Sequence, residues 1–414
     1  MKYEKIFEEV NKISQYAIWG KVPNDKRGMR CLTFGFDDSL NFLGEDIQQF
    51  YNVIDSVWQD KAMFYLARKD IEHFIVKVLD AIHTNGEDAT RNDNRLKNHW
   101  YELLNRKMTN FHVVFPIYGV IVPEITKIGQ FTAYNFADYK KFFTENSFES
   151  ENSLHLHFEK KDKTNYLTLE VEAKSPDRAI ELARKDFELF ECIAQFWLMD
   201  HPHYDVGIFR YVEWNEKNGY VFNDEQIIET FESKGAFQPV PIDFLIKIHN
   251  ADKFWDMVTR YLQGKTTEIE NGVINAVRWV GMANSNDSDV TRYVQYIFAL
   301  EALLAYKSKE EIITPSIAYR LSEWAAFIIG ETAKTTGMDK KDFRKKIFYD
   351  VKSLYSNRSK IVHGTDRKMN KDDVNKARNL IYNIIISFMY NEEILKFKNT
   401  KELAQWIENL KFES

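Results

Sequence analysis

The spacing of hydrophobic positions near the start of the chain predicts helices. Apolar residues recur at three- and four-residue steps from Phe50 to Val78, which predicts a helix over residues 46–85. The polar stretch Asn85–Asn94 interrupts this pattern, and a second helix is predicted over Leu96–Met108.

Beyond residue 110 the hydrophobic period becomes that of strands. Phe111–Val122 is an apolar run rich in β-forming residues. Ser153–Glu159 alternates apolar and polar positions, and a polar turn separates it from Tyr166–Val171, so these two segments predict a β-hairpin. Ser175-Pro176-Asp177 then predicts the start of a helix that runs to about Leu198, because Ser caps, Pro suits the first helical position and Asp interacts with the helix dipole.

From about residue 252 onward the pattern predicts helices only. Gly330 and Gly364 stand at predicted helix ends, where glycine adopts the left-handed conformation at little cost. The predicted helices are Asp252–Gln263, Glu268–Ala283, Asp287–Ala305, Pro315–Ile329, Asp339–His363, Lys371–Tyr390 and Lys401–Leu410. They predict a bundle of four or five helices. The expected fold class is therefore α+β, with a mixed α/β N-terminal region followed by an all-α bundle.

Length and composition support a folded protein of more than one domain. The chain has 414 residues, of which 44% are hydrophobic and 29% charged. We expect an α+β region over residues 1–250, with a subdivision near residue 110, and a helical domain over residues 251–414. Cys31 and Cys192 are too few for a disulfide framework or a zinc cluster, and they fit a reducing cytosol.

The charge is unevenly distributed along the chain. The formal net charge is −6, yet residues 340–378 hold 13 Lys and Arg against 5 Asp and Glu. A local basic patch is sufficient for binding RNA, so the acidic total does not exclude it. The plainer interpretation of the same residues is a solvated helix face.

One short segment carries candidate chemistry. Tyr355–Gly364 contains Arg358 and His363 with four residues between them, but Arg68 and His73 show the same spacing, so spacing alone is a weak signal. Arg106 and His112 are one residue further apart, across a predicted helix end. Only Arg358 and His363 end a basic helix at a glycine. Residues five apart on a helix are separated by about 140° around its axis and about 7.5 Å along it. Arg358 and His363 can therefore contact the same phosphate only if the helix end is distorted or a second subunit completes the site.

Four segments together resemble the Apea-like branch of the HEPN domains over about residues 268–390. The Arg-Ser-Lys-Ile-Val-His-Gly run from Arg358 resembles the HEPN signature, an Arg and a His with four to six residues between them. The other segments are Asn275–Trp279, Phe298–Leu304 and Ala318–Ser322. Ser359 departs from the pattern, since many HEPN nucleases have Asn, Asp or His there, although Ser still forms hydrogen bonds.

The resemblance implies a ribonuclease that needs no metal. His titrates near neutrality and serves as base or acid, while Arg binds phosphate oxygens and stabilises transition-state charge. Arg358 and His363 are therefore the predicted catalytic residues, cleaving RNA by transesterification from the 2′-hydroxyl. HEPN proteins generally dimerise, so we expect a homodimer. The alternative for both residues is capping and pairing with carbonyls at a helix end.

Further residues are candidates for auxiliary roles. Glu301 stands in an otherwise apolar helix and needs a partner, for which Arg358 and Arg320 are both suitable; an orienting role and a structural ion pair stay open. Ser359 and Asn357 flank the motif arginine. Lys352 and Lys360 are candidates for binding RNA, with solvated surface as the alternative.

Histidine pairs elsewhere suggest metal ligands only weakly. His155 and His157 share a strand face, and His201 and His203 flank a proline, but neither pair has a third ligand at a clear spacing. We predict no metal, and no nucleotide-binding fingerprint or other cofactor signal appears.

These observations predict a cytoplasmic protein without a membrane span or secretory leader, since its apolar runs are short and its first residues are polar. The resemblance implies a toxin-like or abortive-infection role in anti-phage defence, with residues 1–250 sensing a phage-derived trigger. The alternative function is a non-catalytic HEPN module that binds a nucleotide, an RNA or a partner protein. The third possible function is that of a purely structural dimeric scaffold.

Overall fold

The chain has the predicted α+β fold class. The computed structural model describes residues 2–22, 29–35, 39–59, 66–145, 165–201, 203–208, 218–222, 227–231, 238–304, 317–332, 338–362 and 369–412. It contains two compact units, Met1–Val113 with Leu169–Lys185, and Val114–Thr168 with Asp186–Ser414. The domain boundaries predicted near residues 110 and 250 stay predictions.

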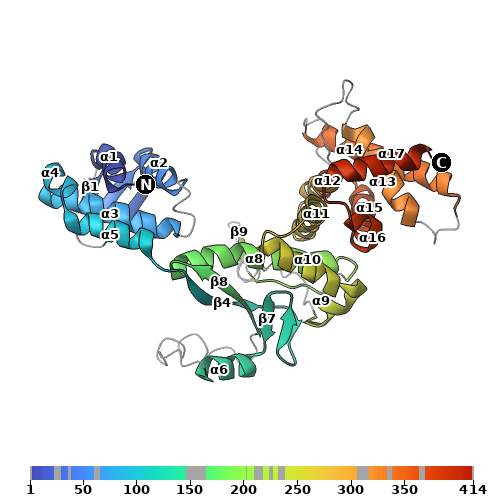
Figure 1. Cartoon of the computed structure of the whole chain (residues 1–414), viewed down its shortest axis with the longest axis horizontal. Helices are drawn as coiled ribbons and strands as arrows, with labels where there is room; N and C mark the ends of the chain where they lie inside the picture. The colour runs from blue at the N-terminus through green and yellow to red at the C-terminus, as the bar shows by residue number, and fades with distance from the viewer. Residues whose placement is uncertain are drawn as a thin grey trace. The chain divides into compact units, whose positions relative to one another are not determined.

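The first unit combines helices with a small antiparallel sheet whose strand order is β1-β3-β2 (Figure 1). Its core buries Phe7, Phe50, Phe74 and Trp100, one from each of four helices. The elements are α1 (Tyr3–Ser14), β1 (Ile18–Trp19), β2 (Cys31–Phe34), β3 (Leu40–Leu43), α2 (Asp46–Trp58), α3 (Arg68–Asn85), α4 (Glu87–Arg91) and α5 (Asn94–Asn105).

The prediction of a single helix over residues 46–85 is wrong, because the structure has two helices there, α2 and α3. Residues 60–65 lie outside the described part of the chain. Ala67 has an extended backbone, with ψ of 148°, and its N–H donates to Asp70 Oδ2 at 3.0 Å. This contact starts a new helix. The hydrophobic period does not reveal the break, because the apolar faces of both helices pack into the same core.

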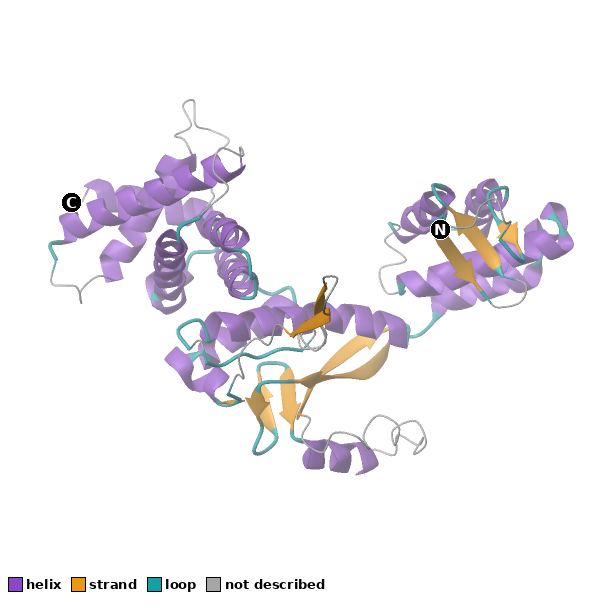
Figure 2. Ribbon diagram, turned by 180° about the vertical axis from the view of Figure 1, so that it is seen from behind, coloured by secondary structure: helices purple, strands orange, loops and turns teal. Residues whose placement is uncertain are grey.

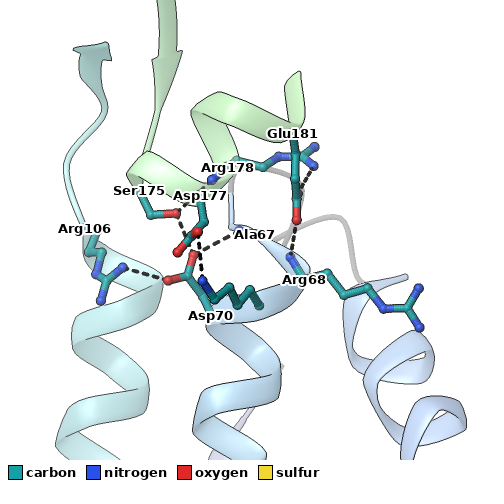
Figure 3. A network of polar contacts seen from close by, with 9 residues as sticks. Ala67, Arg68, Asp70, Arg106, Ser175, Asp177, Arg178 and Glu181 are labelled. Carbon is teal, nitrogen blue, oxygen red and sulfur yellow. Dashed lines mark hydrogen bonds and ion pairs between the residues drawn. The ribbon is translucent and has the colours of Figure 1, made fainter. Parts of the chain in front are cut away.

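Polar side chains join the beginnings of α3 and α8 (Pro176–Trp197), as Figure 3 shows. Asp70 accepts hydrogen bonds from Ser175 Oγ at 2.6 Å and from Arg106 Nη1 at 3.1 Å. Glu181 accepts from Arg178 Nη1 at 2.9 Å and from the first N–H of α3 at 3.2 Å. Ser175 also caps α8, since the Arg178 N–H donates to its Oγ at 3.3 Å, which confirms the predicted start of that helix.

A second sheet follows, with strand order β4-β8-β7-β6. Of the predicted hairpin, Tyr166–Val171 lies in β8 and pairs with β7, while Ser153–Glu159 lies outside the described residues. Helix α8 packs on this sheet, since the Phe187 ring lies 5.1 Å from Phe115 and 5.7 Å from Phe131 (Figure 2). The elements are β4 (Thr109–Ile117), β5 (Val120–Ile121), β6 (Thr126–Ile128), β7 (Phe131–Tyr134), α6 (Phe136–Glu145), β8 (Asn165–Ala173), β9 (Asn218–Phe222), β10 (Ile227–Phe231) and β11 (Val240–Pro241).

The regular elements of the described residues beyond β11 are helices only, which confirms the prediction made for residue 252 onward (Figure 2). The helices are α9 (Phe244–Lys247), the short 3₁₀ helix η4 (Ile248–Asn250), α10 (Asp252–Leu262), α11 (Glu268–Asn284), α12 (Asp289–Leu304), α13 (Ile317–Thr332), α14 (Lys340–Val362), α15 (Lys371–Tyr390), α16 (Glu392–Leu395) and α17 (Thr400–Phe412). None of the helices in the described part is both long and apolar enough to cross a membrane.

One close contact holds α8 against α11, and a second joins two helices of the bundle. A Cβ added to Gly281 of α11 would lie 2.1 Å from the Cys192 carbonyl oxygen of α8, so the two backbones touch at a position that only glycine fits. The Tyr293 hydroxyl of α12 donates to the Leu354 carbonyl of α14 at 2.7 Å. Burial raises the pKa of Tyr293, so the phenol stays protonated and remains a donor.

Candidate active site around Arg358

Arg358 lies near the end of α14, between two aromatic rings and beside a carboxylate. Its guanidinium carbon is 5.8 Å from the centre of the Phe298 ring and 5.7 Å from that of Tyr355. Its Nη2 is 3.8 Å from Glu301 Oε1, and 24% of the Arg358 side chain and 25% of the Glu301 side chain are exposed. The guanidinium is therefore held in position while part of it remains open to solvent.

The hydrogen-bond donors of Arg358 are uncommitted within the described part of the chain. The 3.8 Å ion pair is longer than a hydrogen bond, and Nε is buried without a hydrogen-bond partner among the described residues. A guanidinium carries five N–H donors in a fixed plane, which matches two oxygens of a phosphate or carboxylate. The arrangement can accept an anion without first breaking a strong hydrogen bond.

Each charged residue of this site follows an aromatic residue by three positions on its own helix. Tyr355 precedes Arg358 on α14, and Phe298 precedes Glu301 on α12. Residues three apart on a helix are neighbours, so each ring lies beside its charged partner. The Trp279 ring of α11 lies 5.1 Å from the Phe298 ring, so residues of α11, α12 and α14 meet here.

Electrostatics at the site favour a neutral tyrosine. Burial raises the pKa of Tyr355, the Glu301 carboxylate raises it further, and Arg358 lowers it. Tyr355 therefore retains its proton near neutrality, so it offers a ring and a hydroxyl donor, and no charge, beside Arg358.

The neighbouring candidate residues Asn357 and Ser359 have different surroundings. Asn357 and Leu354 both line a groove of about 900 Å³ along α14 and α15. That groove also contains Lys346 with Asp350, an ion pair at 2.9 Å, so its charges offset one another. Ser359 is half-buried beside Arg358 in the sequence, and it makes no hydrogen bond through its side chain with the described residues.

The remaining predicted residues are distributed around the bundle. Arg320 is buried on α13, and of the two partners considered for Glu301 the structure pairs it with Arg358. Lys352 and Lys360 are exposed on α14. His363 lies outside the described residues, so its distance from Arg358 stays a prediction.

The other histidine pairs have structural surroundings or lie outside the described part. Arg68 begins α3 and pairs with Asp55 at 2.8 Å. His112 Nδ1 lies 2.6 Å from Glu170 on the neighbouring strand. His201 packs edge-on against Phe244 at 5.2 Å, beside a cavity that His203 also lines.

No group of three or more His, Cys, Asp or Glu residues suited to a metal ion occurs among the described residues. His155 and His157 lie outside them. The histidine pairs of the described part therefore have no third metal ligand of this kind beside them.

Phe298 and Tyr355 are the site residues that the sequence did not single out. The signal that could have identified them is the shared spacing, an aromatic residue three positions before each charged residue on an otherwise regular helix. That signal acquires meaning only when α12 and α14 are known to be neighbours.

Comparisons with protein-family models, with curated proteins and with solved structures find no significant match to this chain.

Proposed function

We propose that residues 268–390 form an Apea-like HEPN domain and that the chain is a metal-independent endoribonuclease. The observation that carries this proposal is the state of Arg358, whose guanidinium is fixed by two rings and one carboxylate. Its N–H donors stay uncommitted among the described residues. A positioned cation with free donors is what stabilises charge on a phosphate undergoing substitution.

The proposed reaction is an internal transesterification. The RNA 2′-oxygen attacks the adjacent phosphorus, the bond from phosphorus to the 5′-oxygen breaks, and a 2′,3′-cyclic phosphate and a 5′-hydroxyl form. Arg358 binds the non-bridging oxygens and stabilises the added charge. His363, assigned by the resemblance, takes the 2′-hydroxyl proton, and a second titrating group protonates the leaving oxygen.

A homodimer would supply that second group. One Arg358–His363 pair contains one residue that titrates near neutrality, while the reaction moves two protons. In this proposal the second His363 comes from another copy of the chain. Light scattering at micromolar concentration should report a dimer, and an active monomer would contradict this part of the proposal.

By resemblance, the biological role would be defence against phage, as an abortive-infection or toxin-like nuclease in the cytoplasm. Residues 1–250 would hold the nuclease inactive until a phage-derived component binds to them.

A non-catalytic HEPN module is the second candidate. The groove lined by Asn357 favours it, because a volume of about 900 Å³ lined by apolar side chains and by amide groups suits a nucleotide or a partner segment. In that function Arg358 would bind an anion without cleaving it.

An RNA cleavage assay in excess EDTA distinguishes the two. The wild-type protein should cleave RNA and leave 2′,3′-cyclic phosphate ends, while His363→Ala should not. Strict dependence on magnesium or manganese would contradict the proposed mechanism. Binding of RNA without cleavage under all conditions would support the second candidate.

A further inference from the structure

One face of α14 carries lysines and aromatic residues in alternation. Lys341, Lys345, Phe348, Lys352 and Tyr355 follow one another at steps of three and four residues, so they line up along the helix. We call these five residues the α14 stripe. Its three lysines are exposed and its two aromatic residues are half-buried.

Exposed aromatic rings widen the stripe. Tyr349 is 65% exposed, and its ring lies 5.5 Å from that of Phe348. Tyr319 of α13 is 45% exposed and lies 5.2 Å from Phe348, edge to face. Large aromatic side chains are seldom this accessible, and a contiguous group of them indicates a surface that binds something.

The charge of the stripe is positive and little neutralised. None of its five positions is acidic. Lys345 pairs with Asp342 only at 3.9 Å, with both side chains more than 60% exposed, so the pair contributes little. Lys341 and Lys352 have no ion pair with a described carboxylate, and Lys352 Nζ lies 6.0 Å from the centre of the Phe348 ring.

The stripe ends at the candidate active site. Tyr355 is its last member and also one of the two rings that flank Arg358. A polymer bound along these residues would therefore reach the Arg358 guanidinium. From Lys341 to Lys352 the stripe is about 16 Å long, which suits a few nucleotides rather than a single small ligand.

We infer that the α14 stripe binds single-stranded RNA, with phosphates on its lysines and bases stacked on Phe348 and Tyr349. Bases can stack on protein rings only when they are not paired and stacked in a duplex, so a single strand is the form that fits. The delivery of that strand to Arg358 for cleavage rests on the proposed function. The binding itself rests on the charges and rings of the stripe.

The test is fluorescence anisotropy with a short labelled oligoadenylate, using the full chain on an Arg358→Ala background so that no probe is consumed. Tyr349→Ala should weaken binding roughly 5- to 100-fold, the usual effect of removing one stacking ring. Lys341→Gln and Lys352→Gln should each reduce the slope of log affinity against log salt by about 0.7. A duplex of the same length should bind more weakly and respond little to Tyr349→Ala.

Matched controls come from exposed residues of the same types elsewhere. Tyr101→Ala of α5, at 42% exposure, and Lys401→Gln of α17 should leave both affinity and salt slope unchanged. The lysine and tyrosine side chains substituted on this background are exposed, and circular dichroism of the Arg358→Ala parent and of each variant should show that all of them fold. If Tyr349→Ala and Lys352→Gln bind the probe as tightly as their parent, the inference is overturned.

Cleavage measurements on the native Arg358 background separate this inference from the proposed function. Weakened binding in the stripe variants, with no cleavage by the wild-type protein, would support RNA binding by the α14 stripe and contradict the proposed nuclease function. Cleavage by the wild-type protein, with KM unchanged in every stripe variant, would support the nuclease function and contradict RNA binding by the α14 stripe.

Discussion

Arg358 and Glu301 face each other across α12 and α14, with Nη2 and Oε1 3.8 Å apart. Both side chains are about three-quarters buried, so separating them would leave a charge in poorly solvated surroundings. The distance nevertheless leaves room for an anion to compete for the guanidinium. This combination suits a residue that is held in place and also available to a ligand.

Glu301→Gln should lower the cleavage rate at saturating RNA about tenfold, corresponding to ~1.4 kcal/mol. The amide preserves the shape of the side chain but loses the charge that orients Arg358. The pH–rate profile should keep its form, because in this proposal Glu301 transfers no proton. Glu408→Gln, an exposed carboxylate of α17, is the control. Loss of the acidic limb of the profile would show instead that Glu301 is an acid or a base.

His363→Ala and Arg358→Ala should each reduce cleavage by roughly 10²- to 10⁴-fold. The double variant should lose little more, because residues that act on one transition state are non-additive. His73→Ala is the matched control, since His73 has the same spacing from an arginine and lies exposed on α3. If His73→Ala abolished cleavage and His363→Ala did not, the wrong pair would have been chosen.

Gly281→Ala should destabilise the protein by about 1–3 kcal/mol, read from the midpoint of urea denaturation. The new Cβ would lie 2.1 Å from the Cys192 carbonyl oxygen, so α8 and α11 must move apart. Gly272→Ala on the same helix is the control, with its nearest neighbour at 3.1 Å and a gain in helix propensity of ~1 kcal/mol. Equal stability of the two variants would contradict the close packing of α8 on α11.

Acidification should destabilise the N-terminal unit through His99. Burial, and then the charge of Lys77, hold the pKa of His99 below its ordinary value of 6.5, while Glu102 acts in the opposite direction. A folded-state pKa below the unfolded one stabilises the protein above pH 6.5, and this stabilisation is lost as pH falls through the folded-state pKa. The midpoint temperature of thermal unfolding should fall as pH is lowered from 6.5 through the folded-state pKa of His99, and His99→Gln should reduce this decline.

His73→Gln, an exposed histidine on α3, should leave that decline unchanged. A decline of the same size in His99→Gln as in the wild-type protein would show that other groups cause it.

The sequence by itself determined the elements whose signals are local. The helices of the C-terminal bundle follow from the hydrophobic period and from short polar separators, and the start of α8 follows from Ser175, Pro176 and Asp177. The positive charge along α14 can likewise be counted directly. These features depend on residues a few positions apart, so no knowledge of distant neighbours is needed.

Only the tertiary structure decided which distant residues meet. Asp70 accepts the Ala67 N–H at the start of α3 and also accepts a hydrogen bond from Ser175 Oγ, more than a hundred positions away, and the hydrophobic period reveals neither contact. The sequence identified Glu301 as needing a partner and left two arginines open. The packing of α12 against α14 selected Arg358 and enclosed it between Phe298 and Tyr355. Such contacts depend on how helices are stacked in space, which hydrophobic period and composition do not specify.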